Sequence, residues 1–205
     1  MSRYAIYLAT LLRTPIPLAL FVSLLPLAAA ADHPCVDGQP YGEQVERKER
    51  LPREWLMLNG KVVSDISLHA ELRERYKKAY RSRSDGTGGF MCLKTGRLYI
   101  NVSRWDSGSS FDFSTRAPKC WKCTSMTVDL NQFVPGSGLR IGQTKAQVSA
   151  ILGVSIPNDA EIVAIRFDQV EKDRQKNQSH HEMLRVQFRT DKLISFDVIE
   201  AWEGS

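Results

Sequence analysis

Residues 138–153 read Gly-Leu-Arg-Ile-Gly-Gln-Thr-Lys-Ala-Gln-Val-Ser-Ala-Ile-Leu-Gly, and this stretch contains a short helix with both of its ends. Thr144 and Gln147 have the spacing of a capping box, in which each side chain binds the backbone of the other residue. Gly153 stands where a left-handed residue commonly ends a helix. The apolar face consists of Val148, Ile151 and Leu152. The pattern predicts a helix of about nine residues.

Three stretches of alternating apolar residues follow this helix and predict antiparallel strands. They are 162–167, 184–188 and 193–202. The last two are joined closely, whereas the charged segment 171–181 is expected to be a loop that projects into solvent. The predicted fold class is α+β, with a helix packed on an antiparallel three-stranded sheet.

The upstream part repeats this order of elements, which gives the wider hypothesis of a tandem pseudo-repeat. Asn59-Gly60 predicts a hairpin turn between 55–58 and 61–63, and an amphipathic helix is expected over 66–81. Further strands are expected at 90–93, 98–103 and 111–115, with an edge strand at 126–130. The predicted organisation is a signal peptide (1–31), an N-terminal arm (32–53), a first α+β unit (54–134) and a second (138–205).

The N-terminus has the layout of a secretory signal peptide. Arg3 and Arg13 precede an apolar run over 16–31, and cleavage is expected near Ala30 or Ala31. The alternative is a retained membrane anchor, but Pro15, Pro17 and Pro26 interrupt the run. We therefore expect a periplasmic or secreted protein of the bacterial cell envelope, with no stable membrane anchor after cleavage.

Four cysteines follow the predicted cleavage site, where an oxidising compartment would let disulfides persist. They are Cys35, Cys92, Cys120 and Cys123. Of the three possible pairings we favour Cys120 with Cys123 and Cys35 with Cys92. Cys120-Trp-Lys-Cys123 also has the spacing of a thiol-disulfide redox pair, although strand-like sequence follows it where a helix is usual. No histidine or second Cys-x-x-Cys completes a zinc set, so no metal site is expected.

The stretch 138–153 resembles the opening of the SmpA/OmlA (BamE-like) envelope domain. The matching positions are Ile141, Gly142, Thr144, Val148, Leu152 and Gly153. The resemblance, which covers about 65 residues over 138–202, implies one or two helices on a three-stranded antiparallel sheet. A tandem arrangement is similar to the β-lactamase inhibitory proteins, which implies binding to another protein without catalysis. Cys35 does not follow a lipobox, which sets this chain apart from the lipoproteins of that family.

No catalytic motif or cofactor-binding fingerprint is present, so we predict a non-catalytic protein-binding module whose partner is another envelope or secreted protein. This module would act as an assembly accessory or as an inhibitor or immunity-type binder. The predicted binding anchors are aromatic residues, Tyr99, Trp105, Phe111 and Trp121. The alternative function is a periplasmic thiol-disulfide protein that uses Cys120 and Cys123.

The sequence also contains a cluster of basic residues and a pair of adjacent histidines. Basic residues gather over 73–83, and this segment is either a solvated helix face or a contact for an acidic partner or anionic lipid head groups. We expect no nucleic-acid partner, because the predicted compartment contains none. His180 and His181 are neighbours before a predicted strand and should point to opposite faces, which argues against a shared metal ion.

Overall fold

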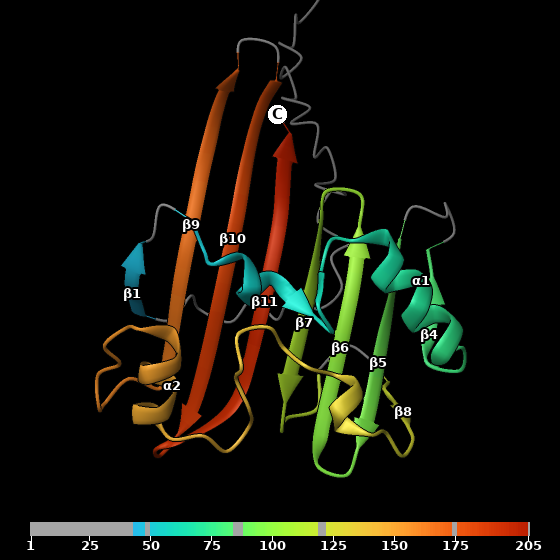
Figure 1. The fold of residues 1–205 in the computed structure, drawn as a ribbon, viewed down its shortest axis with the longest axis horizontal. Coiled ribbons are helices and arrows are strands. Elements are labelled where there is room, and N and C mark those ends of the chain that lie inside the picture. The colour runs from blue at the N-terminus through green and yellow to red at the C-terminus, as the bar shows by residue number, and fades with distance from the viewer. Residues whose placement is uncertain (1–42, 48–49, 84–87, 119–121, 174–175, 205) are drawn as a thin grey trace, which may run out of the picture. The chain divides into compact units, whose positions relative to one another are not determined.

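The structure, a computed structural model, describes residues 43–47, 50–83, 88–118, 122–173 and 176–204. The main strands are β1 (Glu43–Arg47), β4 (Tyr80–Ser82), β5 (Gly89–Thr95), β6 (Leu98–Trp105), β7 (Gly108–Ser114), β8 (Thr124–Ser125), β9 (Ile162–Asp173), β10 (Lys176–Arg189) and β11 (Lys192–Gly204). They form one nine-stranded sheet in the order β1-β9-β10-β11-β7-β6-β5-β4, with β8 beside β5 (Figure 1).

The remaining described elements are short. A two-stranded sheet joins β2 (Met57–Leu58) to β3 (Lys61–Val62), and the helices are α1 (Ile66–Arg75), α2 (Lys145–Leu152) and two 3-10 turns, η1 (Arg53–Leu56) and η2 (Leu130–Gln132). Within the described residues, no helix is both long enough and apolar enough to span a membrane. The expected arm, 32–53, falls partly outside the description, and the signal peptide lies wholly outside it.

The predicted fold class, a helix on a three-stranded sheet, is wrong, because the described chain is mostly β. Strand β11 pairs antiparallel with β7, so strands from 54–134 and from 138–205 enter the same sheet. A three-stranded sheet would leave the long edge of β11 with free backbone donors and acceptors, and the pairing with β7 satisfies them.

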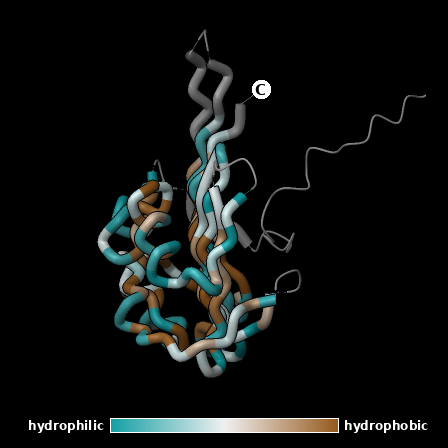
Figure 2. The backbone as a smooth tube through the Cα atoms, turned by 90° about the vertical axis from the view of Figure 1, so that its right-hand side faces the viewer, coloured by the Kyte–Doolittle hydropathy of each residue, from teal (hydrophilic) through white to brown (hydrophobic). Residues whose placement is uncertain are grey.

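Two apolar rows cross the sheet on one face and form the floor of the core. The first row is Met91, Val102, Phe111, Val198, Leu184 and Ile165, and the second is Leu93, Ile100, Phe113, Phe196, Val186 and Val163. All twelve side chains are buried. Buried residues of both α-helices, Leu68 and Leu72 of α1 and Val148 and Leu152 of α2, belong to the same core. We call this the covered face; Figure 2 shows the helices and long connections on one side of the strands.

The two α-helices differ in how well local sequence predicts them. Helix α2 is confirmed: Thr144 and Gln147 form the capping box, and Gly153 is left-handed at φ 62°. The expected helix over 66–81 ends at Arg75, because Tyr80–Ser82 pair with β5 as an edge strand.

Two other expected segments are also corrected. The expected loop over 171–181 is wrong, since β9 extends to Asp173 and β10 begins at Lys176. The expected edge strand over 126–130 is replaced by β8, which is shorter and earlier, and by the start of η2.

Candidate functional site

A cavity of ≈ 320 Å³, lined mostly by apolar residues, opens between the covered face of the sheet and the segment 130–141. Its lining residues are Leu98, Phe113, Leu130, Asn131, Phe133, Val134, Pro135, Leu139, Arg140, Ile141 and Phe196. Leu130 and Val134 are 50% and 41% exposed, which is unusual for aliphatic side chains beside a core. We call this the 130–141 cavity.

The segment beside the cavity is folded by local capping and by one buried ring. Asp129 begins η2, since its carboxylate accepts a hydrogen bond from the Asn131 N–H at 2.9 Å. Phe133 is buried, and its ring lies 5.4 Å from Tyr76 and 6.5 Å from Phe113. The Phe133 ring therefore packs the segment against Tyr76 at the end of α1 and against Phe113 of the sheet. The Leu130 side chain, in contrast, is exposed to solvent.

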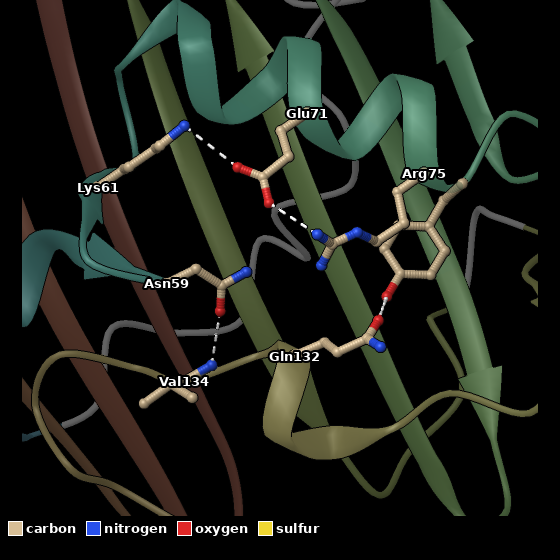
Figure 3. Close-up of polar contacts among 7 residues, drawn as sticks. Asn59, Lys61, Glu71, Arg75, Gln132 and Val134 are labelled. Atoms are coloured by element: carbon tan, nitrogen blue, oxygen red, sulfur yellow. Dashed lines mark hydrogen bonds and ion pairs between the residues drawn. The ribbon is translucent and has the colours of Figure 1, made fainter.

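Hydrogen bonds then hold the segment to the β2–β3 turn and to the end of α1 (Figure 3). Asn59 accepts the Val134 N–H at 2.8 Å and donates its own N–H to the Val134 carbonyl at 2.9 Å. The Tyr76 hydroxyl donates to Gln132 at 2.7 Å. Asn59 has a φ of 55°, a conformation that asparagine adopts more readily than most residues.

Two ion pairs brace the same region. Glu71 of α1 lies 3.1 Å from Lys61 Nζ and 3.2 Å from Arg75 (Figure 3). These ion pairs link β3 to α1, and Asn59 and Tyr76 beside these two elements bind Val134 and Gln132 of the rim. A rim fixed before binding loses little conformational freedom when a partner docks.

The chemistry of the 130–141 cavity suits an apolar group. Arg140 is the one charged residue among the described lining residues, and its guanidinium donates to the neighbouring Leu139 carbonyl at 2.8 Å. Nothing in that lining set resembles an acid and base pair or a nucleophile beside a base. The cavity can receive an aliphatic or aromatic side chain, and Arg140 can contact an acidic group near it.

The aromatic anchors predicted from sequence lie elsewhere. Phe111 is fully buried in the core, and Trp105 is 6% exposed, so neither offers an exposed anchor in this structure. Tyr99 is half-buried on the face opposite the helices, with Lys94 Nζ 5.7 Å from its ring centre. Trp121 lies outside the described residues. Sequence reasoning missed Leu130 and Val134; the available signal was two aliphatic residues in the turn-rich run Asp-Leu-Asn-Gln-Phe-Val-Pro-Gly over 129–136.

The disulfide arrangement also differs from the one we favoured. Cys92 is bridged to Cys123, which excludes the pairs Cys120–Cys123 and Cys35–Cys92. The reason is the parallel pairing of β8 with β5, which places Thr124 opposite Leu93 and so brings the two bonded cysteines together. Cys35 and Cys120 lie outside the described residues.

A polar cluster lies on β10 and β11, next to the apolar rows of the covered face. Glu182 is 1% exposed and accepts the Leu51 N–H at 3.2 Å. His180 Nε2 lies 3.8 Å from Glu182 and 3.7 Å from Glu200, and its ring stacks on Trp202 at 4.0 Å. In the described part of the chain, no group of three or more histidine, cysteine or acidic side chains is arranged to hold a metal ion.

Comparisons with known proteins returned no relative: no family model, no curated protein and no solved structure matches the chain. The resemblance of residues 138–153 to the SmpA/OmlA opening therefore stays a prediction.

Proposed function

We propose that this chain is an exported, non-catalytic protein-binding module of the cell envelope, and that its partner inserts an apolar side chain into the 130–141 cavity. The observation that carries the proposal is a cavity of ≈ 320 Å³ whose rim exposes Leu130 and Val134. Interfaces concentrate their binding energy where a large side chain fills a preformed pocket. The role would be that of an assembly accessory or of an inhibitor.

Three features support a binding role for this surface. The cavity floor is made of Leu98, Phe113 and Phe196 from three neighbouring strands, and the two phenylalanine rings belong to the core. The rim is fixed by the contacts of Asn59 and Tyr76. Nine of the eleven described lining residues are apolar, which favours burial of an apolar anchor over chemistry on a polar substrate.

The thiol-disulfide alternative fits the structure less well. It needs Cys120 and Cys123 as an exchanging pair, but the Cys123 sulfur is bonded to Cys92 on a neighbouring strand. A bridge that closes a sequence separation of 31 residues ties β5 to the segment that precedes β8, which is a structural role.

The proposal is tested by affinity capture from periplasmic extract with three forms of the protein. We compare the wild type, the double variant Leu130→Ser/Val134→Ser and the matched control Ile151→Ser. Ile151 is also an exposed aliphatic residue, but it lies on α2 and does not line the cavity.

We expect a protein that the wild type and the control both retain and that the double variant loses. Thermal melts of the three forms check that each is folded. Equal recovery by all three forms would contradict the assigned site, and no enrichment over blank resin would contradict the binding function itself.

A further inference from the structure

A second cavity, of ≈ 250 Å³, lies between α1 and the strands β4 to β6. One side of α1 forms one wall, with Ile66, His69, Ala70 and Arg73, and the opposite wall is formed by Tyr80, Ser82, Gly88 and Arg104. Among the described lining residues, none carries a carboxylate and two carry guanidinium groups. Arg73, Tyr80 and Ser82 of the lining belong to the basic segment 73–83, and the proposed binding function uses none of the three.

Arg104 is an unusual residue for the covered face of the sheet. It follows Val102 in the alternation of β6, so it points to the side that holds the core, and it is half-buried. It lies opposite Gly89 of β5. A Cβ atom at Gly89 would lie only 2.6 Å from the Tyr80 hydroxyl oxygen. The absence of a side chain at Gly89 therefore provides the space in which this hydroxyl lies.

The two guanidinium groups of the cavity keep N–H donors that no described carboxylate binds. The nearby acids of α1 are engaged elsewhere, since Glu71 pairs with Lys61 and Arg75, and Glu74 pairs with Lys77. Arg73 and Arg104 have no ion-pair partner in the described part of the chain. Asp65, the N-cap of α1, interacts electrostatically with Arg104 but forms no ion pair with it. An anion bound directly to the half-buried guanidinium would therefore still offset part of the cost of its burial.

Two further groups of the cavity, Tyr80 and His69, differ in what they can offer an anion, because the first can donate a hydrogen bond and the second cannot. Burial raises the pKa of Tyr80, and Arg73 and Arg104 act in the opposite direction, which places both cations close to this protonated hydroxyl. His69 is 4% exposed; its Nε2 lies 2.9 Å from the Val63 carbonyl and must therefore carry the hydrogen. Its Nδ1 has no hydrogen-bond partner among the described residues and can only accept a hydrogen bond, for example from a protonated oxygen of the ligand.

We propose that this cavity binds a phosphate-class oxyanion, held by the guanidinium groups of Arg104 and Arg73 with the hydroxyls of Tyr80 and Ser82. Guanidinium groups suit this ligand because their N–H donors match the spacing of phosphate oxygens. The volume fits one small group, either free phosphate or the head of a small phosphate ester. The inference concerns a different surface from the 130–141 cavity and does not depend on the proposed function.

The test is calorimetric titration of the purified, disulfide-intact protein with inorganic phosphate and, separately, with glycerol phosphate, in a phosphate-free buffer of low ionic strength. We expect saturable binding at one site. Arg104→Gln should weaken it by about tenfold or more, the effect of losing one charge-assisted contact. Arg73→Gln, a change at an exposed position that folding tolerates, should weaken it in the same direction.

The matched control is Lys78→Gln, which removes one positive charge from the same segment at an exposed position outside the cavity. Unchanged affinity in this control, with loss in both arginine variants, supports the site. Tighter binding of the ester than of phosphate identifies a head group as the ligand, and the reverse identifies the free anion. Absence of saturable binding to the wild type, or equal weakening by Lys78→Gln and Arg73→Gln, would overturn the proposal.

Discussion

At the scale of single residues, His69 is a buried imidazole whose protonation is disfavoured in the folded protein. Burial lowers its pKa, the hydrogen bond to the Val63 carbonyl acts in the opposite direction, and the nearby Arg104 lowers it further. The unfolded chain therefore takes up more protons than the folded protein as the pH falls below about 6.5. The stability linked to His69 is present above that pH and is lost below it.

Replacement of His69 by Gln, which keeps an N–H donor for the Val63 carbonyl, should reduce this pH dependence. We expect the free energy of unfolding to fall less between about pH 7.5 and about pH 5.5 in His69→Gln than in the wild type. Urea denaturation at both values, in phosphate-free buffers, measures the difference. Equal losses in the two proteins would show that His69 is not the group that titrates.

Individual site residues were hard to predict because their positions depend on contacts that are distant in sequence. Alternation correctly places Phe111 and Phe113 on one face of a strand, but it does not say that this face is the core. The pairing of Cys92 with Cys123 depends on the parallel contact of β5 with β8, and no local pattern indicates that contact.

At the scale of elements, α2 was predictable because its signals lie within ten residues of one another. Its capping box, apolar face and left-handed Gly153 all come from the local sequence. The start of α1 also has a local signal, because the Asp65 carboxylate caps the helix by accepting a hydrogen bond from the Ser67 N–H. Its end was not predictable from local sequence. The helical spacing of apolar residues continues to Tyr80, but Tyr80–Ser82 form a strand that pairs with β5.

The capping box of α2 can be measured directly. Thr144→Ala removes the acceptor for the Gln147 N–H and should lower the free energy of unfolding by about 1 kcal/mol. Thr127→Ala, at an exposed position outside any described helix or strand, is the control and should change it by less than about 0.5 kcal/mol. Chemical denaturation of both variants measures the two changes in the free energy of unfolding. Equal changes would show that the cap makes no special contribution to stability.

At the scale of the whole molecule, the sequence indicated the strands of each half but not the sheet that joins them. Period-two alternation identifies which residues share a face, yet it carries no information on which strand lies beside which. The β7–β11 contact that overturns the three-stranded sheet is long-range, and it is stabilised by the ring of Phe113 stacked on that of Phe196 at 5.0 Å. The same two rings form part of the cavity floor, so the candidate site could not be predicted without this contact.

The joined sheet predicts that both halves of the described chain unfold together. Phe113→Ala removes a ring that contacts Phe111, Phe133 and Phe196, and it should cost about 3–5 kcal/mol. Hydrogen exchange of amides in α1 and in α2, followed across denaturant concentrations, should show the two helices losing protection at one lowered midpoint. If α2 kept its original midpoint while α1 lost protection, the halves would be separate folding units and the β7–β11 junction would contribute little to stability. A common shift would mean that the cavity floor and both helices depend on the same core, so that a partner bound at Leu130 and Val134 would stabilise the whole sheet.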